Sequence, residues 1–133
     1  MSLLDDPALL RSLLAGLPEA LIVTDTQGCI REWNDAAERL FGFPRGEALG
    51  ASLDILVPER FRAAHDAGFA RAVATGDLRV DGRVMRTRAT HKDGRKLYVD
   101  FSFALLKDAQ GQVVGVYATG RDATEAQLKA SAG

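Results

Sequence analysis

The spacing of hydrophobic residues changes along the chain from a helical repeat to a strict alternation. Near the N-terminus five leucines recur at helical spacing: Leu9, Leu10, Leu13, Leu14 and Leu17. Asp6 as N-cap, Pro7 at the first helical position and Gly16 at the end predict a helix within residues 1–17. Because its leucines form two lines, wider than one small sheet requires, we expect a dimerisation element; the alternative is packing on its own sheet.

A β-hairpin and short helices are predicted next. The aliphatic run 20–25 (ALIVTD) and the segment 29–33 (CIREW) are typical of two strands joined by a glycine-containing turn. Asn34 is placed to cap a following helix, and residues 42–50 carry turn signals around a short helical piece. The folded core therefore begins with two paired strands and continues into helices.

The second half of the chain predicts three more strands. Residues 79–90 form the first, an Asp-Gly turn follows, residues 96–107 alternate between hydrophobic and polar positions, and 113–120 form the last. One face of the alternating strand is apolar: Leu97, Val99, Phe101, Phe103 and Leu105. Five antiparallel strands with one helical excursion make an α+β domain, with helices covering the apolar face and a pocket between helices and sheet.

A single domain accounts for the whole chain. Its 133 residues are enough for one core, and 47% apolar with 26% charged residues is ordinary for a globular protein. We assign residues 1–17 to the N-terminal helix, 18–121 to the core and 122–133 to the start of an outgoing helix. Asp122 and Glu125 form the capping-box signature of that last helix.

Composition argues against several classes of partner. The net charge of −1 gives no electrostatic reason to bind nucleic acid or a membrane surface. The basic stretch 83–96 is typical of a solvated strand face. No apolar run reaches the roughly 20 residues of a membrane span, no signal peptide is recognised, and Cys29 is the only cysteine, so we expect a cytoplasmic protein.

A histidine lies on the apolar stripe of a helix predicted between Pro58 and Gly76. Phe61, His65 and Phe69 are spaced four apart, which places them on one helix face. An imidazole directed into the pocket could bind a metal or a cofactor, or it could be a core histidine that donates to a backbone carbonyl. The spacing leaves both interpretations open.

The sequence contains no motif that predicts catalysis. Asp66 follows His65, but adjacent helix positions point about 100° apart, so we expect the two side chains not to face one site. The chain has no nucleophile motif, glycine-rich phosphate loop or zinc-ligand spacing, and His91 is expected to be solvated in a turn. We therefore expect a domain without enzymatic activity, with any catalysis in a separate output domain.

Three segments, in order and at their spacing, resemble the PAS domains of bacterial sensor proteins. They are LPEALIVTDTQGCIREWNDAAERLFGF, the stretch from ALG to LVP, and THKDGRKLYVDFSFALLKDAQGQVVGVYATGRDATE. The resemblance covers residues 8–126 and implies the PAS fold and a sensory role in signal transduction. It also implies that Arg121, Asp122 and Thr124 pass the signal to the outgoing helix.

The segment PERFRAAHDAGFARAVATG is similar to the haem-binding branch of that family, which includes oxygen-sensing histidine kinases. His65 matches the position of the proximal histidine in that branch. The resemblance therefore implies haem b as the cofactor, with His65 as the iron ligand and Phe61 and Phe69 beside it.

Two strands supply the distal positions of the same resemblance. Arg83 and Met85 stand where that branch carries a methionine and an arginine, so their order is swapped, and Phe101 and Phe103 stand at apolar distal positions. The swap means that the resemblance implies haem binding more directly than oxygen binding. Four arginines are candidate partners for haem propionates: Arg79, Arg83, Arg86 and Arg88.

Three interpretations of the pocket remain open: a haem-based gas or redox sensor, a receptor for a small organic ligand, and a cofactor-free interaction and dimerisation module. The cysteine motif of the photoactive flavin-binding branch is absent, which argues against a cysteinyl-flavin cofactor. In each case we expect a homodimer formed through the N-terminal helix and an output domain in a longer chain. That output domain would be a two-component histidine kinase, a cyclic-nucleotide enzyme or a DNA-binding transcription regulator.

Overall fold

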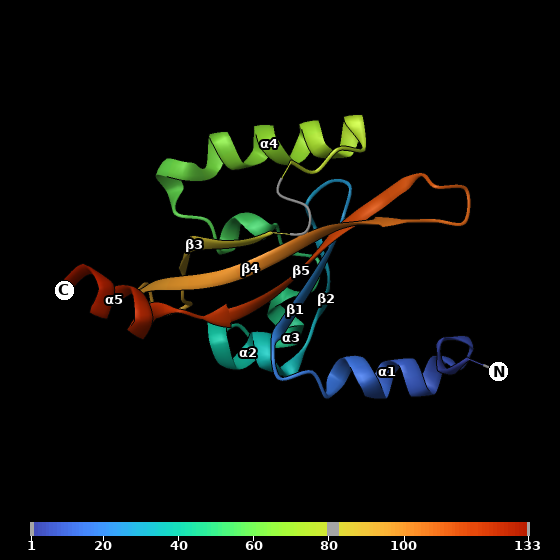
Figure 1. Cartoon of the computed structure of the whole chain (residues 1–133), viewed down its shortest axis with the longest axis horizontal. Coiled ribbons are helices and arrows are strands. Elements are labelled where there is room, and N and C mark those ends of the chain that lie inside the picture. The colour runs from blue at the N-terminus through green and yellow to red at the C-terminus, as the bar shows by residue number, and fades with distance from the viewer. Residues whose placement is uncertain (1, 80–82, 133) are drawn as a thin grey trace.

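A computed structural model describes residues 2–79 and 83–132, which contain a five-stranded antiparallel sheet in the order β2-β1-β5-β4-β3. The strands are β1 (Ala20–Asp25), β2 (Ile30–Trp33), β3 (Val84–Thr90), β4 (Lys96–Lys107) and β5 (Val113–Asp122). The α+β class and the five antiparallel strands predicted from the sequence are confirmed. The first and last strands of the chain are neighbours at the centre of the sheet (Figure 1).

Helical segments occupy the connection between β2 and β3 and both ends of the described chain (Figure 1). The α-helices are α1 (Pro7–Ala15), α2 (Asp35–Phe41), α3 (Arg45–Ala48), α4 (Arg62–Thr75) and α5 (Thr124–Ala132), and the 3-10 turns are η1 (Leu3–Asp5), η2 (Leu53–Ile55) and η3 (Glu59–Phe61). No helix in the described part of the chain is long and apolar enough to cross a membrane.

The core lies between one face of the sheet and the helices that follow β2. On β4, the side chains of Leu97, Val99 and Phe101 are buried, as the alternation predicts. Lys96, the first residue of the strand, is exposed. The largest fully buried side chains are Trp33, Phe41, Ile30 and Val99. Burial of these large side chains is the main source of stability for a domain of this size.

Close contact between β4 and β5 depends on a glycine. Phe101 and Gly120 are paired across the two strands. A Cβ built on Gly120 would lie 2.7 Å from Cε1 of Phe101 and 2.9 Å from Cγ1 of Val99. The missing side chain therefore lets the Phe101 ring lie across β5.

Several predicted boundaries differ from the structure. β3 begins at Val84 rather than at residue 79, and residues 80–82 of that predicted strand lie outside the described residues. Cys29 is outside β2 and forms an isolated bridge with Ser52. The helix predicted from Pro58 starts as the 3-10 turn η3, with the Phe61 amide donating to the Pro58 carbonyl at 2.8 Å, and becomes α-helical at Arg62.

The N-terminal helix α1 extends away from the sheet (Figure 1). None of its nine described residues is buried, and Leu9 and Leu13 are 47% and 51% exposed. Its ends agree with the sequence, because the Asp6 carboxylate accepts from the Ala8 amide and Gly16 is the C-cap. The helix thus leaves an apolar surface without a partner in the described chain.

Candidate functional site

His65 lies among two carboxylates on the helical side of the domain. Its Nδ1 is 3.5 Å from Oδ1 of Asp66 in α4 and 3.9 Å from Oδ1 of Asp54 in η2. The imidazole ring also lies beside the Phe69 ring, at 6.4 Å between centroids. The His65 side chain is 35% exposed, so this cluster, which we call the Asp54–His65–Asp66 cluster, is open to water.

The expectation that His65 and Asp66 would not share a site is wrong. Their Cα–Cβ bonds leave the helix in different directions. The side-chain rotamers nevertheless bring the His65 imidazole and the Asp66 carboxylate close to each other and to Asp54. Asp54 was missed by sequence reasoning, because it precedes His65 by 11 positions in a short turn with no periodic pattern. Only the packing of η2 beside α4 brings it there.

The turn that carries Asp54 is held firmly by the backbone. The Leu53 amide donates to the Gly28 carbonyl at 2.9 Å, and Ser52 pairs with Cys29, which directly precedes β2. The Ser52 hydroxyl also accepts from the Asp54 amide at 3.1 Å. These bonds fix the backbone of the turn that carries Asp54 relative to the sheet.

The environment of Asp54 favours its protonated form. Partial burial raises the pKa of its carboxyl, and a hydrogen bond with Asp66 and the negative charge of Asp66 raise it further. His65 and Arg62 act in the opposite direction without cancelling the rise. The raised pKa of Asp54 therefore comes first from burial and then from its contact with Asp66.

The apolar stripe predicted on the long helix is only partly formed. Phe61 belongs to η3, is 42% exposed, and has the Arg60 guanidinium 4.7 Å above its ring. Phe69 faces the turn between the first two strands, where a Cβ on Gly28 would lie 4.0 Å from its Cε1. The structure therefore places Phe69, but not Phe61, next to His65.

Met85, Phe101 and Phe103 lie together on the core face of the sheet. Met85 is paired with Phe101 across β3 and β4 and is 36% exposed. The Phe101 ring stacks on Phe41 at 6.2 Å and meets Phe103 at 5.3 Å. Arg83 precedes β3 and is exposed, with an Nη2 contact of 3.4 Å to the Arg79 carbonyl.

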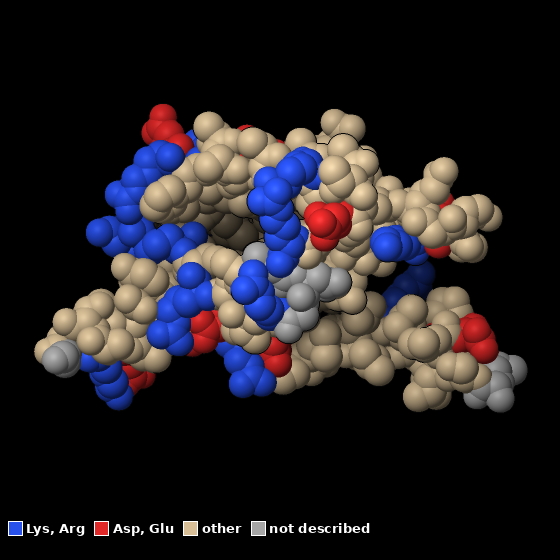
Figure 2. All heavy atoms as spheres, turned by 45° about the horizontal axis from the view of Figure 1, so that its top comes forward, with Lys and Arg blue, Asp and Glu red and all other residues tan. Residues whose placement is uncertain are grey.

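Figure 2 shows that the surface beside α4 is hollowed and that Lys and Arg side chains gather around the recess. An open pocket is lined by Pro58, Glu59, Arg60 and Arg88. Arg88 Nε is buried without a hydrogen-bond partner among the described residues. Arg86, by contrast, is engaged by Asp100 through Nε and Oδ1 at 2.8 Å, which makes it a poorer candidate for binding a ligand.

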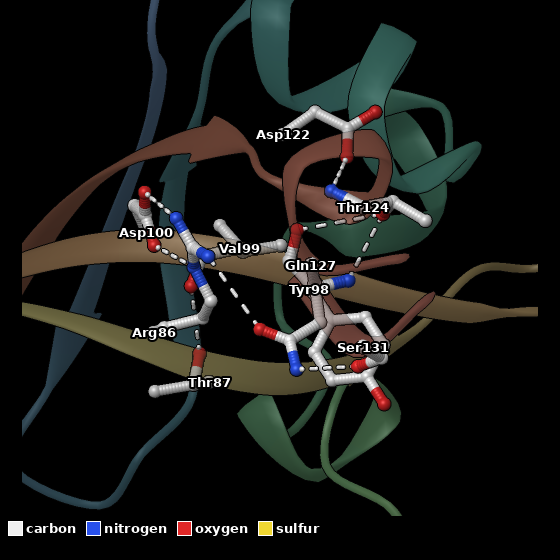
Figure 3. A network of polar contacts seen from close by, with 9 residues as sticks. All are labelled: Arg86, Thr87, Tyr98, Val99, Asp100, Asp122, Thr124, Gln127 and Ser131. Atoms are coloured by element: carbon white, nitrogen blue, oxygen red, sulfur yellow. Dashed lines mark hydrogen bonds and ion pairs between the residues drawn. The ribbon is translucent and has the colours of Figure 1, made fainter. Parts of the chain in front are cut away.

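The outgoing helix α5 is tied to the sheet by polar contacts (Figure 3). The Thr124 hydroxyl accepts from the Tyr98 amide at 3.0 Å, and the Ala123 amide donates to the Tyr98 carbonyl at 2.7 Å. The Asp122 carboxylate accepts from the Thr124 amide at 2.9 Å. The helix start is therefore fastened to the first residues of β4.

A second tie reaches α5 from the sheet edge, and sequence reasoning did not identify it. Arg86 pairs with Asp100 across β3 and β4, and its Nη1 approaches Oε1 of Gln127 at 3.5 Å (Figure 3). Arg121, to which the family resemblance also assigns an output role, pairs instead with Glu19 at 2.9 Å. The opposite charges of Arg86 and Asp100 on neighbouring strands are the signal that could have indicated the first pair.

Comparison with known proteins agrees with this architecture. The family described as PAS fold matches residues 14–128. Sensor protein FixL of Bradyrhizobium diazoefficiens is 37% identical over 120 residues, which is 89% of this chain and 23% of that protein. Oxygen sensor protein DosP of Escherichia coli is 34% identical over 81 residues, 61% of this chain and 10% of DosP.

The chain therefore spans less than a quarter of the length of these two relatives. Among solved structures, a PAS domain from Colwellia psychrerythraea superposes with a TM-score of 0.76 at 25% identity, covering 90% of this chain and 99% of the other. Sequence, strand order and known relatives all agree: this chain is a sensory domain that belongs to the PAS family.

Proposed function

We propose that this domain is the input module of a longer cytoplasmic signalling protein and that it binds haem through His65. The observation that carries the proposal is the position of Nδ1 of His65 between two carboxylates. An acceptor at Nδ1 fixes the tautomer in which Nε2 is free of a proton and can bind iron. The similarity to FixL and to the oxygen sensor DosP supports the same assignment.

Haem bound through His65 would draw on residues of several elements, because the open pocket itself is lined by Pro58, Glu59, Arg60 and Arg88. Haem needs an apolar slot, an imidazole ligand and basic groups near its propionates. Phe69 lies beside His65, and Met85, Phe101 and Phe103 offer an apolar sheet face. Arg60 and Arg88 line an open pocket and are candidates for the propionates.

Bound haem would supply an iron that changes its ligand or oxidation state. The protein residues would convert that change into a movement of β4. Phe101 and Phe103 lie on the core face of β4, and the Phe101 ring lies across Gly120 of β5. A displaced ring would therefore push on β4, where Tyr98 holds Thr124 at the start of α5, and on β5, which leads directly into that helix.

The output would leave through α5 and be shared within a homodimer. Exposed leucines of α1 and of the preceding turn form the surface that we assign to the dimer: Leu3, Leu4, Leu9 and Leu13. Burying such side chains against a second copy removes apolar area from water. Any catalytic activity would then belong to an output domain such as a histidine kinase.

One observation favours a cofactor-free interaction module as the second candidate. Phe101 already stacks on Phe41 and packs against Phe103, so aromatic rings occupy part of the sheet face. In that case His65 would serve only the Asp54–His65–Asp66 cluster. The two candidates differ in whether the purified domain takes up haem at one site.

Titration with haemin decides between them. We expect a saturable Soret band at one haem per chain, lost or shifted in His65→Ala and retained in His91→Gln, which changes the other histidine. Carbon monoxide added to the reduced protein and to Met85→Leu then reports whether Met85 is the sixth ligand. Weak and equal haemin binding by the parent and His65→Ala would contradict the haem assignment and favour the interaction module.

A further inference from the structure

The Asp54–His65–Asp66 cluster has the geometry of a site for a small cation. The ligand atoms of its three side chains all lie within 4.8 Å of one another. In a zinc site with bonds of about 2.0–2.2 Å, neighbouring ligand atoms are about 3–3.5 Å apart. The separations of 3.5 and 3.9 Å from Nδ1 of His65 to the two carboxylates are already near this range.

We propose that Asp54, His65 and Asp66 bind a divalent transition-metal ion of the Zn²⁺ type, which clamps α4 to η2. One imidazole and two carboxylates make a ligand set suited to Zn²⁺, Co²⁺ or Mn²⁺. The side chains are 30%, 35% and 58% exposed for Asp54, His65 and Asp66, so water can complete the coordination and the ion has a path to enter.

The charge of the cluster supports a cation at this place. Two carboxylates in contact repel each other unless a proton or a cation lies between them. The positive charge of Arg62 also acts on Asp54, but the Arg62 Nε donates to the Val57 carbonyl at 3.0 Å. A divalent ion at the centre would contact both carboxylates and the imidazole at once.

The consequence of binding follows from the unequal anchoring of the two segments. Asp54 is on a turn bonded to Gly28 and Cys29, whereas α4 buries only Ala72 among its fourteen described residues. An ion shared by the two would fix the N-terminal half of α4 against the body of the domain. The site would therefore set how readily the recess beside α4 opens.

This inference goes beyond the proposed function and uses a different atom of the same ring. Haem iron would bind Nε2 of His65, whereas the cation would bind Nδ1 and displace its proton. The two proposals consequently have separate readouts, which are the Soret band for haem and metal stoichiometry in haem-free protein for the cation. His65→Ala removes a ligand from both sites, so the Asp54 and Asp66 variants, read by metal stoichiometry in haem-free protein, are the ones that test the cation site separately.

The test is calorimetric titration of the haem-free, chelator-washed domain with Zn²⁺, together with the visible spectrum of the Co²⁺ form. We expect one ion per chain, with affinity reduced more than about tenfold in Asp54→Asn and in Asp66→Asn. Asp77→Asn, which changes an exposed aspartate beyond the other end of α4, should leave affinity unchanged. The Co²⁺ absorption should be lost in His65→Ala.

Hydrogen exchange measured on the same samples tests the clamp. Zn²⁺ should slow exchange of α4 amides at least about tenfold, with no change in α2, because binding adds stability only to the segment it fixes. Equal Zn²⁺ affinity in the parent, Asp54→Asn and Asp66→Asn, or unchanged exchange in α4 at saturation, would overturn the proposal. Haemin binding that survives such a result would leave the proposed function standing.

Discussion

Helices α2 and α4 both lie in the connection between β2 and β3, but they are attached to the domain very differently. The seven residues of α2 include three that are buried: Ala36, Ala37 and Phe41. The fourteen residues of α4 include one, Ala72. Asn34 caps the first turn of α2 by accepting from the Ala37 amide, whereas within the described residues no side chain caps α4.

The difference distinguishes α2, which is part of the folded core, from α4, which is packed weakly enough to change position. Segments with few buried contacts open at a lower free-energy cost than the core. In this domain the polar residues of the Asp54–His65–Asp66 cluster lie on the weakly packed helix and its neighbouring turn. A ligand or ion bound there, as we propose, would therefore change the position of α4 without unfolding the sheet and α2.

Truncating Phe41 should give the largest effect. Phe41 is fully buried and packs against Trp33 and Phe101, so Phe41→Ala should reduce the free energy of unfolding by about 3–5 kcal/mol. Phe61→Ala, at a 42% exposed position just before α4, should cost less than about 1 kcal/mol. Urea unfolding monitored by circular dichroism measures both, and similar losses would show that the two helices are equally anchored.

Removing the cap of α2 comes next. Oδ1 of Asn34 accepts from the Leu21 amide at 2.9 Å and the Ala37 amide at 3.0 Å, and Nδ2 donates to the Glu19 carbonyl at 3.0 Å. Asn34→Ala should therefore cost about 2–3 kcal/mol in thermal or urea unfolding. Asn34→Asp keeps the acceptor and should lose less; a larger loss for Asp than for Ala would contradict this account of the cap.

A pair of glycines tests the contact that we assign to signalling. Gly120→Ala places a methyl group against Phe101 and Val99 and should lower the free energy of unfolding by about 1–3 kcal/mol. Gly46→Ala in α3 meets no atom within 4 Å and should raise it by about 0.5–1 kcal/mol. If Gly120→Ala proves neutral, Phe101 can move aside at no cost and is a poor transmitter.

The smallest expected effects are changes in the pH dependence of stability, and the first concerns the Asp54–His65–Asp66 cluster. Because the pKa of Asp54 is raised in the folded state, protonation of Asp54 stabilises that state. The stabilisation is fully present at pH values below the ordinary pKa of 3.8 and is lost as the pH rises through the higher pKa of the folded state. In chelator, Asp54→Asn should therefore raise the melting temperature near pH 7 and leave it nearly unchanged in acid.

Asp100 provides the opposite case on the sheet. Its hydrogen bond with Arg86 is the main cause of a lowered pKa, so its contribution is present above 3.8 and is lost as pH falls through the lower folded pKa. Asp100→Asn should lower the melting temperature near pH 7. Shifts of the same sign for the two variants would show that one of these environments is wrongly assigned.

Much of the fold could be predicted because its determinants are local. The alternation of β4, the Asp6 and Asn34 caps and the Gly16 helix end each follow from a few adjacent residues. The prediction of where the helix before His65 begins is less accurate, because Pro58 is compatible with both a 3-10 and an α-helical first turn. The decision between them depends on packing that is not encoded next to the proline.

The candidate site was predicted less completely because it joins separate elements. His65 was identified from its spacing with two phenylalanines, yet Phe61 lies in η3 away from the stripe. Asp54 lies near His65 because η2 is hydrogen-bonded to the first hairpin. Asp66 lies near His65 because of its side-chain rotamer. Neither contact leaves a periodic signal, so the sequence alone could not indicate the cluster.

The central position of the last strand has a consequence for how the chain folds. The β1–β2 and β3–β4 hairpins can each form from nearby residues, but β5 must pair with both β1 and β4 to join them. Such pairing of distant segments slows folding, because loop closure has to precede the contacts. During synthesis the edges of the two hairpins would therefore stay unpaired until residue 122 has left the ribosome. Chaperones would bind the exposed strand edges during this time.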